Sequence, residues 1–174
     1  MNNKKPLIGF IGQGWIGKNY ANDFEARGFE TVRFSLEEPY IKNKEQIKNC
    51  DFVFIAVPTP TTPNGFDVRI VDEAISLVGD GKVAILKSTI VPGTTKKLQE
   101  KHTHCKVFYS PEFLSEVTAK YDVENPFSNI VGIPEKTEEN KILAQKVLDT
   151  LPNSPFSLIC LTTEAEIIKY THNV

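Results

Sequence analysis

The chain has 174 residues, of which 40% are hydrophobic and 24% are charged, and its formal net charge is −2. This length and composition are typical of one globular domain with a full core. The small negative charge predicts that neither nucleic acid nor an anionic membrane is a partner. No apolar run approaches the roughly 20 residues that span a bilayer, and no signal segment is visible. The lone, widely spaced cysteines predict a reducing, cytoplasmic context.

Cysteines and histidines are few and scattered. Cys50, Cys105 and Cys160 are too far apart to indicate a disulfide framework or a zinc site, so we expect no metal. The last two fall in strand-like segments and are expected in the core. The three histidines, His102, His104 and His172, have no convincing partner in the sequence and are interpreted as surface residues.

Strand-like and helix-like segments alternate along the chain. In chain order, strands are expected at residues 7–11, 31–34, 51–57, 83–86, 106–109, 129–132 and 157–161. Helices are expected at 16–27, 68–78, 94–101, 137–151 and 163–174, with a short one within 37–49. Residues 58–65 are typical of a turn, and Asp67 is placed to cap the next helix. The alternation predicts an α/β fold of Rossmann type: a doubly wound, mostly parallel sheet with helices on both faces.

The domain is expected to occupy residues 1–162. The last helical segment, 163–174, carries no stop signal, so we interpret it as the truncated start of a longer central helix.

The first strand runs directly into a glycine-rich turn, Gly12-Gln13-Gly14-Trp15-Ile16-Gly17. Glycines at this spacing, between a strand and a helix, are the fingerprint of a dinucleotide-binding turn. The first permits the tight turn, the second leaves room for the pyrophosphate, and the third lets the helix pack on the strand. The helix N-terminus then offers free N–H groups to the phosphates. We expect these six residues to bind the cofactor.

The end of the second strand does not carry the acidic residue that usually binds the adenine ribose. Ser35 stands at that position, and Glu37 follows two residues later. Ser35, with Arg33 nearby, also leaves room for a 2′-phosphate. We therefore expect NAD, with NADP as an open alternative.

Five segments form a recognisable set: IGFIGQGWIG at 8–17, CDFVFIAVPTP at 50–60 with NGFD at 64–67, KSTIVPGT at 87–94, SPEFLSE at 110–116 and AEIIKYTHN at 165–173. In this order they resemble the UDP-glucose/GDP-mannose dehydrogenase family, whose members oxidise the C6 hydroxyl of a nucleotide sugar to a carboxylate in two NAD-dependent steps. The resemblance implies that five further residues contact the cofactor: Val57, Pro58, Thr59, Thr89 and Glu116.

The resemblance also implies roles in the chemistry. Lys169 matches the lysine that stabilises negative charge on oxygen, and Asn173, four residues later, shares its helix face. Thr89 matches a residue that positions the catalytic water. Glu112 matches a carboxylate that acts as a base, and Glu116 matches a second carboxylate near the nicotinamide.

Some positions depart from the family pattern. Ser110 stands where asparagine is usual, Val117 replaces a common glycine, and the stretch between the second strand and Asp51 is short. The family's sugar-binding domain and catalytic cysteine are not found within the 174 residues. Without that thiol, we expect these residues alone to bind dinucleotide but to lack full activity.

The favoured hypothesis is the NAD-binding domain of a nucleotide-sugar 6-dehydrogenase, with UDP-glucose as the first choice of substrate. One alternative is an oxidoreductase of the β-hydroxyacid dehydrogenase type, and another is a non-catalytic, nucleotide-sensing Rossmann module. The resemblance also implies a homodimer for the full-length protein.

Overall fold

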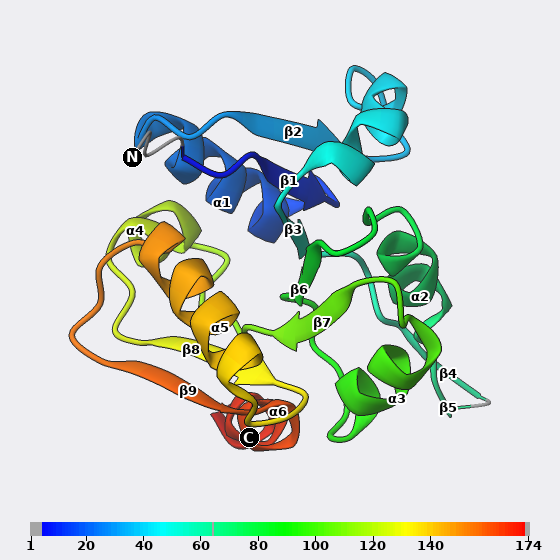
Figure 1. Ribbon diagram of the computed structural model, residues 1–174. Coiled ribbons are helices and arrows are strands. Elements are labelled where there is room, and N and C mark those ends of the chain that lie inside the picture. Colours follow the sequence, from blue (N-terminus) through cyan, green and yellow to red (C-terminus); the bar gives the residue numbers. More distant parts are fainter. Residues whose placement is uncertain (1–4, 64, 173–174) are drawn as a thin grey trace.

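The computed structural model describes residues 5–63 and 65–172, and a seven-stranded sheet lies at its centre (Figure 1). In spatial order the strands are β2 (Thr31–Phe34), β1 (Ile8–Ile11), β3 (Phe52–Ile55), β6 (Val83–Leu86), β7 (Lys106–Tyr109), β8 (Asn129–Ile133) and β9 (Ser157–Leu161). The first five are parallel, whereas β8 pairs antiparallel with β7 and β9 is parallel to β8. The expected mostly parallel sheet is confirmed.

Helices cover both faces of the sheet. One face packs against α1 (Trp15–Ala26), α4 (Ala119–Glu124) and α5 (Glu138–Thr150), which lie to the left of β3, β6 and β7 in Figure 1. The other packs against the 3-10 helix η1 (Ile41–Asn49), α2 (Arg69–Ile75) and α3 (Thr94–Lys101). The last helix, α6 (Thr162–His172), packs against α3 and the β7–β9 part of the sheet. This arrangement confirms the expected doubly wound architecture.

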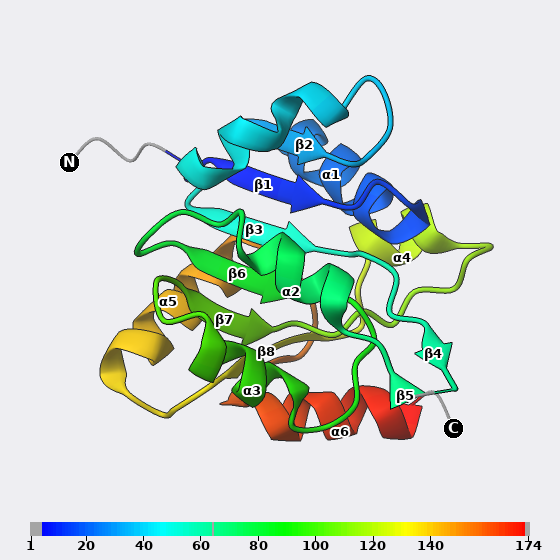
Figure 2. The ribbon, with the colours of Figure 1, turned by 90° about the vertical axis from the view of Figure 1, so that its right-hand side faces the viewer.

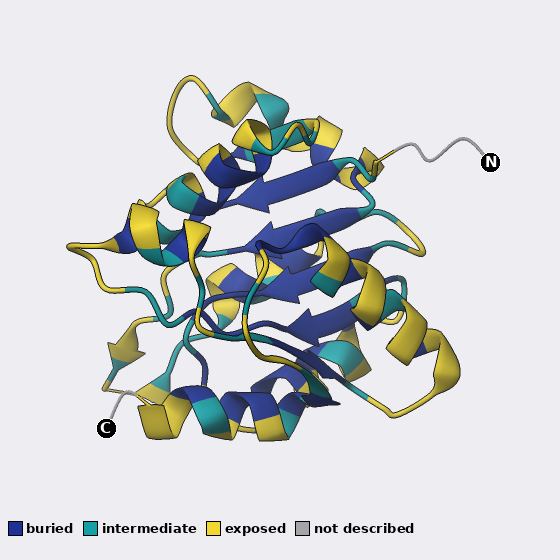
Figure 3. Cartoon of the chain, turned by 90° about the vertical axis from the view of Figure 1, so that its left-hand side faces the viewer, coloured by how far each residue is buried: buried dark blue, intermediate teal, exposed yellow. Residues whose placement is uncertain are grey.

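The central strands are buried over their whole length. Every residue of β1, β3 and β6 is buried, as the dark strands of Figure 3 show. Strands covered on both faces read as continuous apolar runs, which is why these three were visible in the sequence. On the α1 face the rings of Phe10, Phe24 and Phe54 pack with centroids 5.2–5.5 Å apart.

Three local features differ from the expectations. The helix α4 was not predicted; it buries Ala119 and Val123, and Asp122 accepts hydrogen bonds from the residues that precede it. The expected turn at 58–65 contains a small antiparallel hairpin, β4 (Thr61–Thr62) with β5 (Gly65–Phe66). Asp67 precedes the first residue of α2 by two positions, and its Oδ1 accepts from the Arg69 N–H at 3.0 Å.

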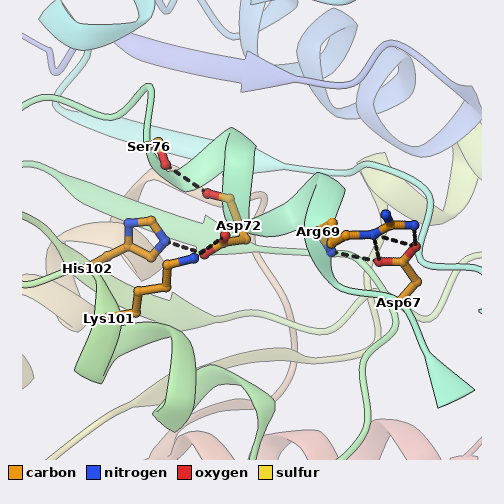
Figure 4. Close-up of polar contacts among 6 residues, drawn as sticks. All are labelled: Asp67, Arg69, Asp72, Ser76, Lys101 and His102. Atoms are coloured by element: carbon orange, nitrogen blue, oxygen red, sulfur yellow. Dashed lines mark hydrogen bonds and ion pairs between the residues drawn. The ribbon is translucent and has the colours of Figure 1, made fainter. Parts of the chain in front are cut away.

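A polar cluster joins α2 to the end of α3 (Figure 4). Asp72 of α2 accepts hydrogen bonds from Lys101 and His102, with 2.7 Å between the His102 Nε2 and the Asp72 Oδ1. His102 is buried, and the neighbouring His104 hydrogen-bonds to the Val78 carbonyl. The interpretation of these two histidines as surface residues without partners is therefore wrong: His102 fastens the chain after α3 to α2, and His104 fastens it to the segment that follows α2.

The carboxyl ends of β1, β3, β6 and β7 all meet at one edge of the sheet (Figure 2). The chain leaves β1 toward α1 on one face, and after β3 it leads to α2 on the other. Such a reversal is a topological switch point, where doubly wound sheets bind their ligands. Most of the predicted site residues therefore fall on the segments that directly follow these four strands, whereas Ser35 follows β2 and Lys169 lies on α6.

Candidate functional site

The glycine turn is shaped by close contacts with the end of β3. Gly12 has φ of 92°, and a Cβ at this position would lie 2.2 Å from the Ala56 carbonyl oxygen. A Cβ on Gly17 would lie 2.0 Å from the Gly12 carbonyl oxygen, so α1 can start this close to the turn only with glycine. Gly14 is exposed, and its missing Cβ faces open space. The turn is thus closed toward the protein and open toward a ligand.

The N-terminus of α1 lies at this opening. The helix begins at Trp15, and no side chain among the described residues caps it. The first N–H groups of a helix have no intrahelical partner and carry a partial positive charge, so they suit a phosphate. Gln13 donates to the Gly12 carbonyl, while its own Oε1 is buried without a partner among the described residues. This opening fits the pyrophosphate of a dinucleotide.

The loops after β3 and β6 are fastened to each other. The Ser88 hydroxyl donates to the Val57 carbonyl at 2.8 Å and accepts from the Val57 N–H at 3.0 Å. The Thr59 hydroxyl donates to the Thr89 carbonyl at 2.7 Å. Pro58 is exposed between them. The structure therefore brings together Val57, Thr59 and Thr89, which the resemblance had placed in one cofactor site.

A buried ion pair links α6 to the loop after β7. The Lys169 Nζ donates to the Glu112 Oε1 at 2.8 Å and to the Glu112 carbonyl at 2.7 Å. The other carboxylate oxygen accepts from the Leu114 N–H at 2.8 Å. Both charged side chains are 5% exposed, and the ammonium lies 5.7 Å from the centre of the Phe113 ring. The two residues predicted from separate segments as catalytic are thus direct partners.

A second lysine, Lys87, is buried near this pair and was not predicted as a site residue. Its Nζ donates to the carbonyl and hydroxyl oxygens of Ser110 at 3.3 and 3.2 Å and lies 4.2 Å from the centre of the Tyr20 ring. No ion pair is found for it among the described residues. Burial lowers the pKa of Lys87 to about 7, with Glu112 opposing this change. Charge on Lys87 is therefore poorly compensated.

Glu166 positions α6 against α3, and sequence reasoning also missed it. Its fully buried carboxylate accepts from the backbone N–H of Gly93 at 2.6 Å, and from the N–H and hydroxyl of Thr95 at 2.8 and 2.6 Å. It caps the start of α3 from a distant helix. The Tyr109 hydroxyl lacks a partner among the described residues; burial raises the pKa of Tyr109, and the nearby carboxylates of Glu166 and Glu112 add to this effect.

The remaining predicted residues lie apart from this pair or outside the described chain. Glu116 is exposed on the loop that precedes α4. Ile16 is half-buried and Trp15 is 39% exposed at the start of α1. Asn173 lies outside the described residues. The roles predicted for these four residues stay predictions.

At the end of β2, the Ser35 hydroxyl is hydrogen-bonded to the backbone of Glu37 at 3.3 and 3.4 Å. The Arg33 guanidinium points to α1 and pairs with Glu25 and Asn22. It is therefore not poised to bind a 2′-phosphate.

The cysteines offer no nucleophile. Burial raises the pKa of Cys50 to about 12 and that of Cys105 and Cys160 to about 11. A thiol reacts as its thiolate, so these three are unreactive core residues, as expected for Cys105 and Cys160. Within residues 5–63 and 65–172, no group of three or more His, Cys, Asp or Glu side chains could hold a metal ion, and no helix is long and apolar enough to cross a membrane.

Comparison with known proteins points to one family. The model of the UDP-glucose/GDP-mannose dehydrogenase family, NAD binding domain, matches residues 36–149. A UDP-glucose 6-dehydrogenase of Campylobacter jejuni is 31% identical over 136 residues, which cover 75% of this chain and 34% of that protein. The chain thus spans about a third of that relative's length.

Solved structures agree on the fold. A UDP-glucose dehydrogenase from Pyrobaculum islandicum superposes with a TM-score of 0.82 at 22% identity, covering 99% of this chain and 50% of that one. A GDP-mannose dehydrogenase from Pseudomonas aeruginosa superposes with a TM-score of 0.76 at 21% identity, covering 95% of this chain and 49% of that one. By its matched residues, this chain belongs to the UDP-glucose/GDP-mannose dehydrogenase family and carries that family's NAD-binding domain.

Proposed function

We propose that the chain is the cofactor-binding part of a nucleotide-sugar 6-dehydrogenase, with UDP-glucose as its first substrate. The observation that carries the proposal is the buried Lys169–Glu112 pair: Glu112 follows β7 at the same edge of the sheet at which the glycine turn follows β1. Family membership supports this assignment. The relatives and structural neighbours include both UDP-glucose and GDP-mannose dehydrogenases, so UDP-glucose is the narrower part of the proposal.

Oxidation of an alcohol needs a hydride acceptor, a base, and a group that stabilises charge on oxygen. Bound NAD supplies the acceptor. Lys169 has three N–H bonds, and two of them donate to Glu112, so one is available for a substrate oxygen. Its burial strengthens that contact because water does not compete there.

Glu112 has two parts to play in this proposal. Its carboxylate holds the Lys169 ammonium in place, and the same carboxylate acts as the general base in the hydrolysis step. Thr89, on the loop fastened to Thr59, positions the attacking water. Asn173, four residues after Lys169 in the sequence, is proposed as a second polar group of the site.

The second oxidation in this family passes through a thioester and needs a reactive thiol. The raised pKa values of the three cysteines exclude them from that role. We therefore expect the 174 residues to bind NAD without producing a uronate. A homodimer and a cytoplasmic location for the complete protein stay predictions.

The test uses the complete gene product. NADH formation is followed with UDP-glucose, GDP-mannose and a β-hydroxyacid, in the native protein and in Lys169→Met. We expect turnover of a nucleotide sugar and a loss of at least about 100-fold in Lys169→Met, since about 3 kcal/mol is typical for one stabilising donor. Turnover of the β-hydroxyacid alone would favour the alternative oxidoreductase. A nucleotide-dependent regulatory output that survives in Lys169→Met would favour the sensing module.

A further inference from the structure

The end of β2 lacks the group that normally distinguishes NAD from NADP. An acidic residue there binds the ribose hydroxyls of NAD and disfavours a 2′-phosphate. In this chain Ser35 occupies the position, and its hydroxyl bonds to the backbone of Glu37. A neutral serine does not repel a phosphate, so discrimination against NADP must come from another part of this corner.

Arg33 is the cation of β2, and α1 holds it in place. Its Nε donates to the Glu25 Oε1 at 2.9 Å, and one terminal nitrogen lies 2.7 Å from the Glu25 Oε2 and donates to the Asn22 Oδ1 at 2.8 Å. Thr31 donates to the same Glu25 carboxylate. The Arg33 side chain is 10% exposed, whereas that of Glu25 is 46% exposed. The guanidinium is therefore bound on two sides against α1.

Alternation along the strand places Arg33 on the same face as Ser35. Thr31 and Arg33 both contact Glu25 of α1, so odd-numbered residues of β2 face that helix. Ser35 directly follows the last residue of β2 and lies two residues beyond Arg33, which is about 7 Å for extended backbone. A free arginine side chain can cover that distance toward the ribose position. Asn22 and Glu25 lie in the second half of α1, away from the glycine turn, and they hold the guanidinium away from the ribose position.

We propose that Glu25, assisted by Asn22, is a specificity-determining residue that holds Arg33 away from the 2′ position and so keeps the chain selective for NAD. The proposal rests on the NAD-binding function. A free guanidinium binds phosphate with two parallel hydrogen bonds, whereas one already paired with a carboxylate is neutralised.

The test measures binding rather than turnover. Trp15 is the single tryptophan of the chain, and it lies 39% exposed at the start of α1, so its fluorescence reports on the glycine turn. NAD and NADP are each titrated into the native chain and into Glu25→Gln. We expect NADP affinity to rise by about 10-fold in Glu25→Gln, equivalent to about 1.4 kcal/mol, while NAD affinity stays within about 2-fold.

Two controls separate this mechanism from a general change in charge. Glu25→Gln/Arg33→Met should return NADP affinity to the native level, because the released cation is gone. Glu30→Gln removes the same charge from the exposed residue that precedes β2 without touching the Arg33 pair, and it should leave the NADP/NAD ratio unchanged. Thermal unfolding of each variant verifies that it is folded.

Three results would overturn the proposal. An unchanged ratio of NADP to NAD affinity in Glu25→Gln would show that Glu25 does not keep Arg33 away from the 2′ position. An equal rise in the double variant or in Glu30→Gln would assign the effect to net charge. Failure of the native chain to bind either dinucleotide would contradict the NAD-binding function itself, and the selectivity with it.

Discussion

Replacement of Lys87 by methionine should stabilise the protein at neutral pH. Lys87 is 2% exposed, and its ammonium has two long hydrogen bonds to Ser110 and the Tyr20 ring as neighbours. The charged groups that face it are Glu112, which favours the ammonium, and Lys169, which disfavours it. Methionine replaces the unbranched stem of the side chain, is one heavy atom shorter, and removes the charge.

The size of the effect follows from the pKa. Burial lowers the pKa of Lys87 from 10.5 to about 7, and a difference of this size corresponds to about 5 kcal/mol of lost stability when the lysine is charged in both states. Methionine gives up two hydrogen bonds to Ser110, worth about 1 kcal/mol each. We therefore expect Lys87→Met to unfold with a free energy about 3 kcal/mol higher at pH 7.

The sign of the pH dependence follows from proton binding. Between pH 7 and 10.5 the unfolded chain holds a proton on Lys87 that the folded chain has released, so native stability rises with pH in this window. Below pH 7 both states are protonated and the cost is constant. The advantage of Lys87→Met should therefore shrink by about 2 kcal/mol between about pH 7 and pH 9.

The assay is urea unfolding of the native chain, Lys87→Met and Lys97→Met across this pH range. Lys97 is exposed on α3, so its variant controls for the loss of one lysine charge. Parallel profiles for the native chain and Lys87→Met would refute the reasoning. So would a Lys87→Met protein that is less stable than the native chain at pH 7, since the ammonium would then be well compensated.

Three further predictions rest on single contacts. Gly14→Val should fold as well as the native chain, because the added side chain meets open space. Its NAD binding, measured by Trp15 fluorescence, should be at least about 10-fold weaker, because the side chain occupies the place of the pyrophosphate. Unchanged affinity would contradict the glycine-turn site. Glu166→Gln should lower the free energy of unfolding, measured in urea, by about 2–4 kcal/mol, because the new amide NH2 group would face backbone N–H donors. A loss below about 1 kcal/mol would show that the cap is weak. Burial alone raises the pKa of Asp72, but hydrogen bonds from Lys101 and His102 outweigh burial and lower this pKa. Asp72→Asn should therefore lower the free energy of unfolding by about 1 kcal/mol at neutral pH. This loss should vanish in acid, where the native carboxylate takes up its proton. A cost that persists in acid would mean that charge is not the cause.

Local sequence patterns were enough for most of the fold. Thr31–Phe34, Val83–Leu86 and Lys106–Tyr109 form strands with the predicted bounds because each is a short run rich in β-branched, aromatic or aliphatic residues between turn residues. The reversed direction of β8 was not predictable in this way, because a strand pattern is the same in either direction. Helix α4 is six residues long, and two buried residues do not make a periodic signal.

The candidate site was predictable where it rests on backbone geometry or on a family motif. The spacing of Gly12, Gly14 and Gly17 is imposed by contacts that a Cβ would break. Lys169 and Glu112 came from the resemblance and proved to be partners. The environment of Lys87 was not predictable, because charged residues are rarely buried and a sequence does not show which partner lies above them.

Two buried residues of α6, Glu166 and Lys169, contact distant parts of the chain, and these contacts matter for the site. Glu166 and Lys169 are three residues apart, so they share one face of the helix, and both are buried. Glu166 caps α3 just beyond the loop that carries Thr89, whereas Lys169 holds Glu112 on the loop after β7. One helix face therefore sets the positions of two loops that follow different strands. Each contact spans 57 to 73 residues of sequence, and both charges need these particular partners to be tolerated in the interior. A change in the rotation of α6 would disturb both loops together, and Glu166→Gln should therefore weaken the alignment of Lys169 as well as the start of α3.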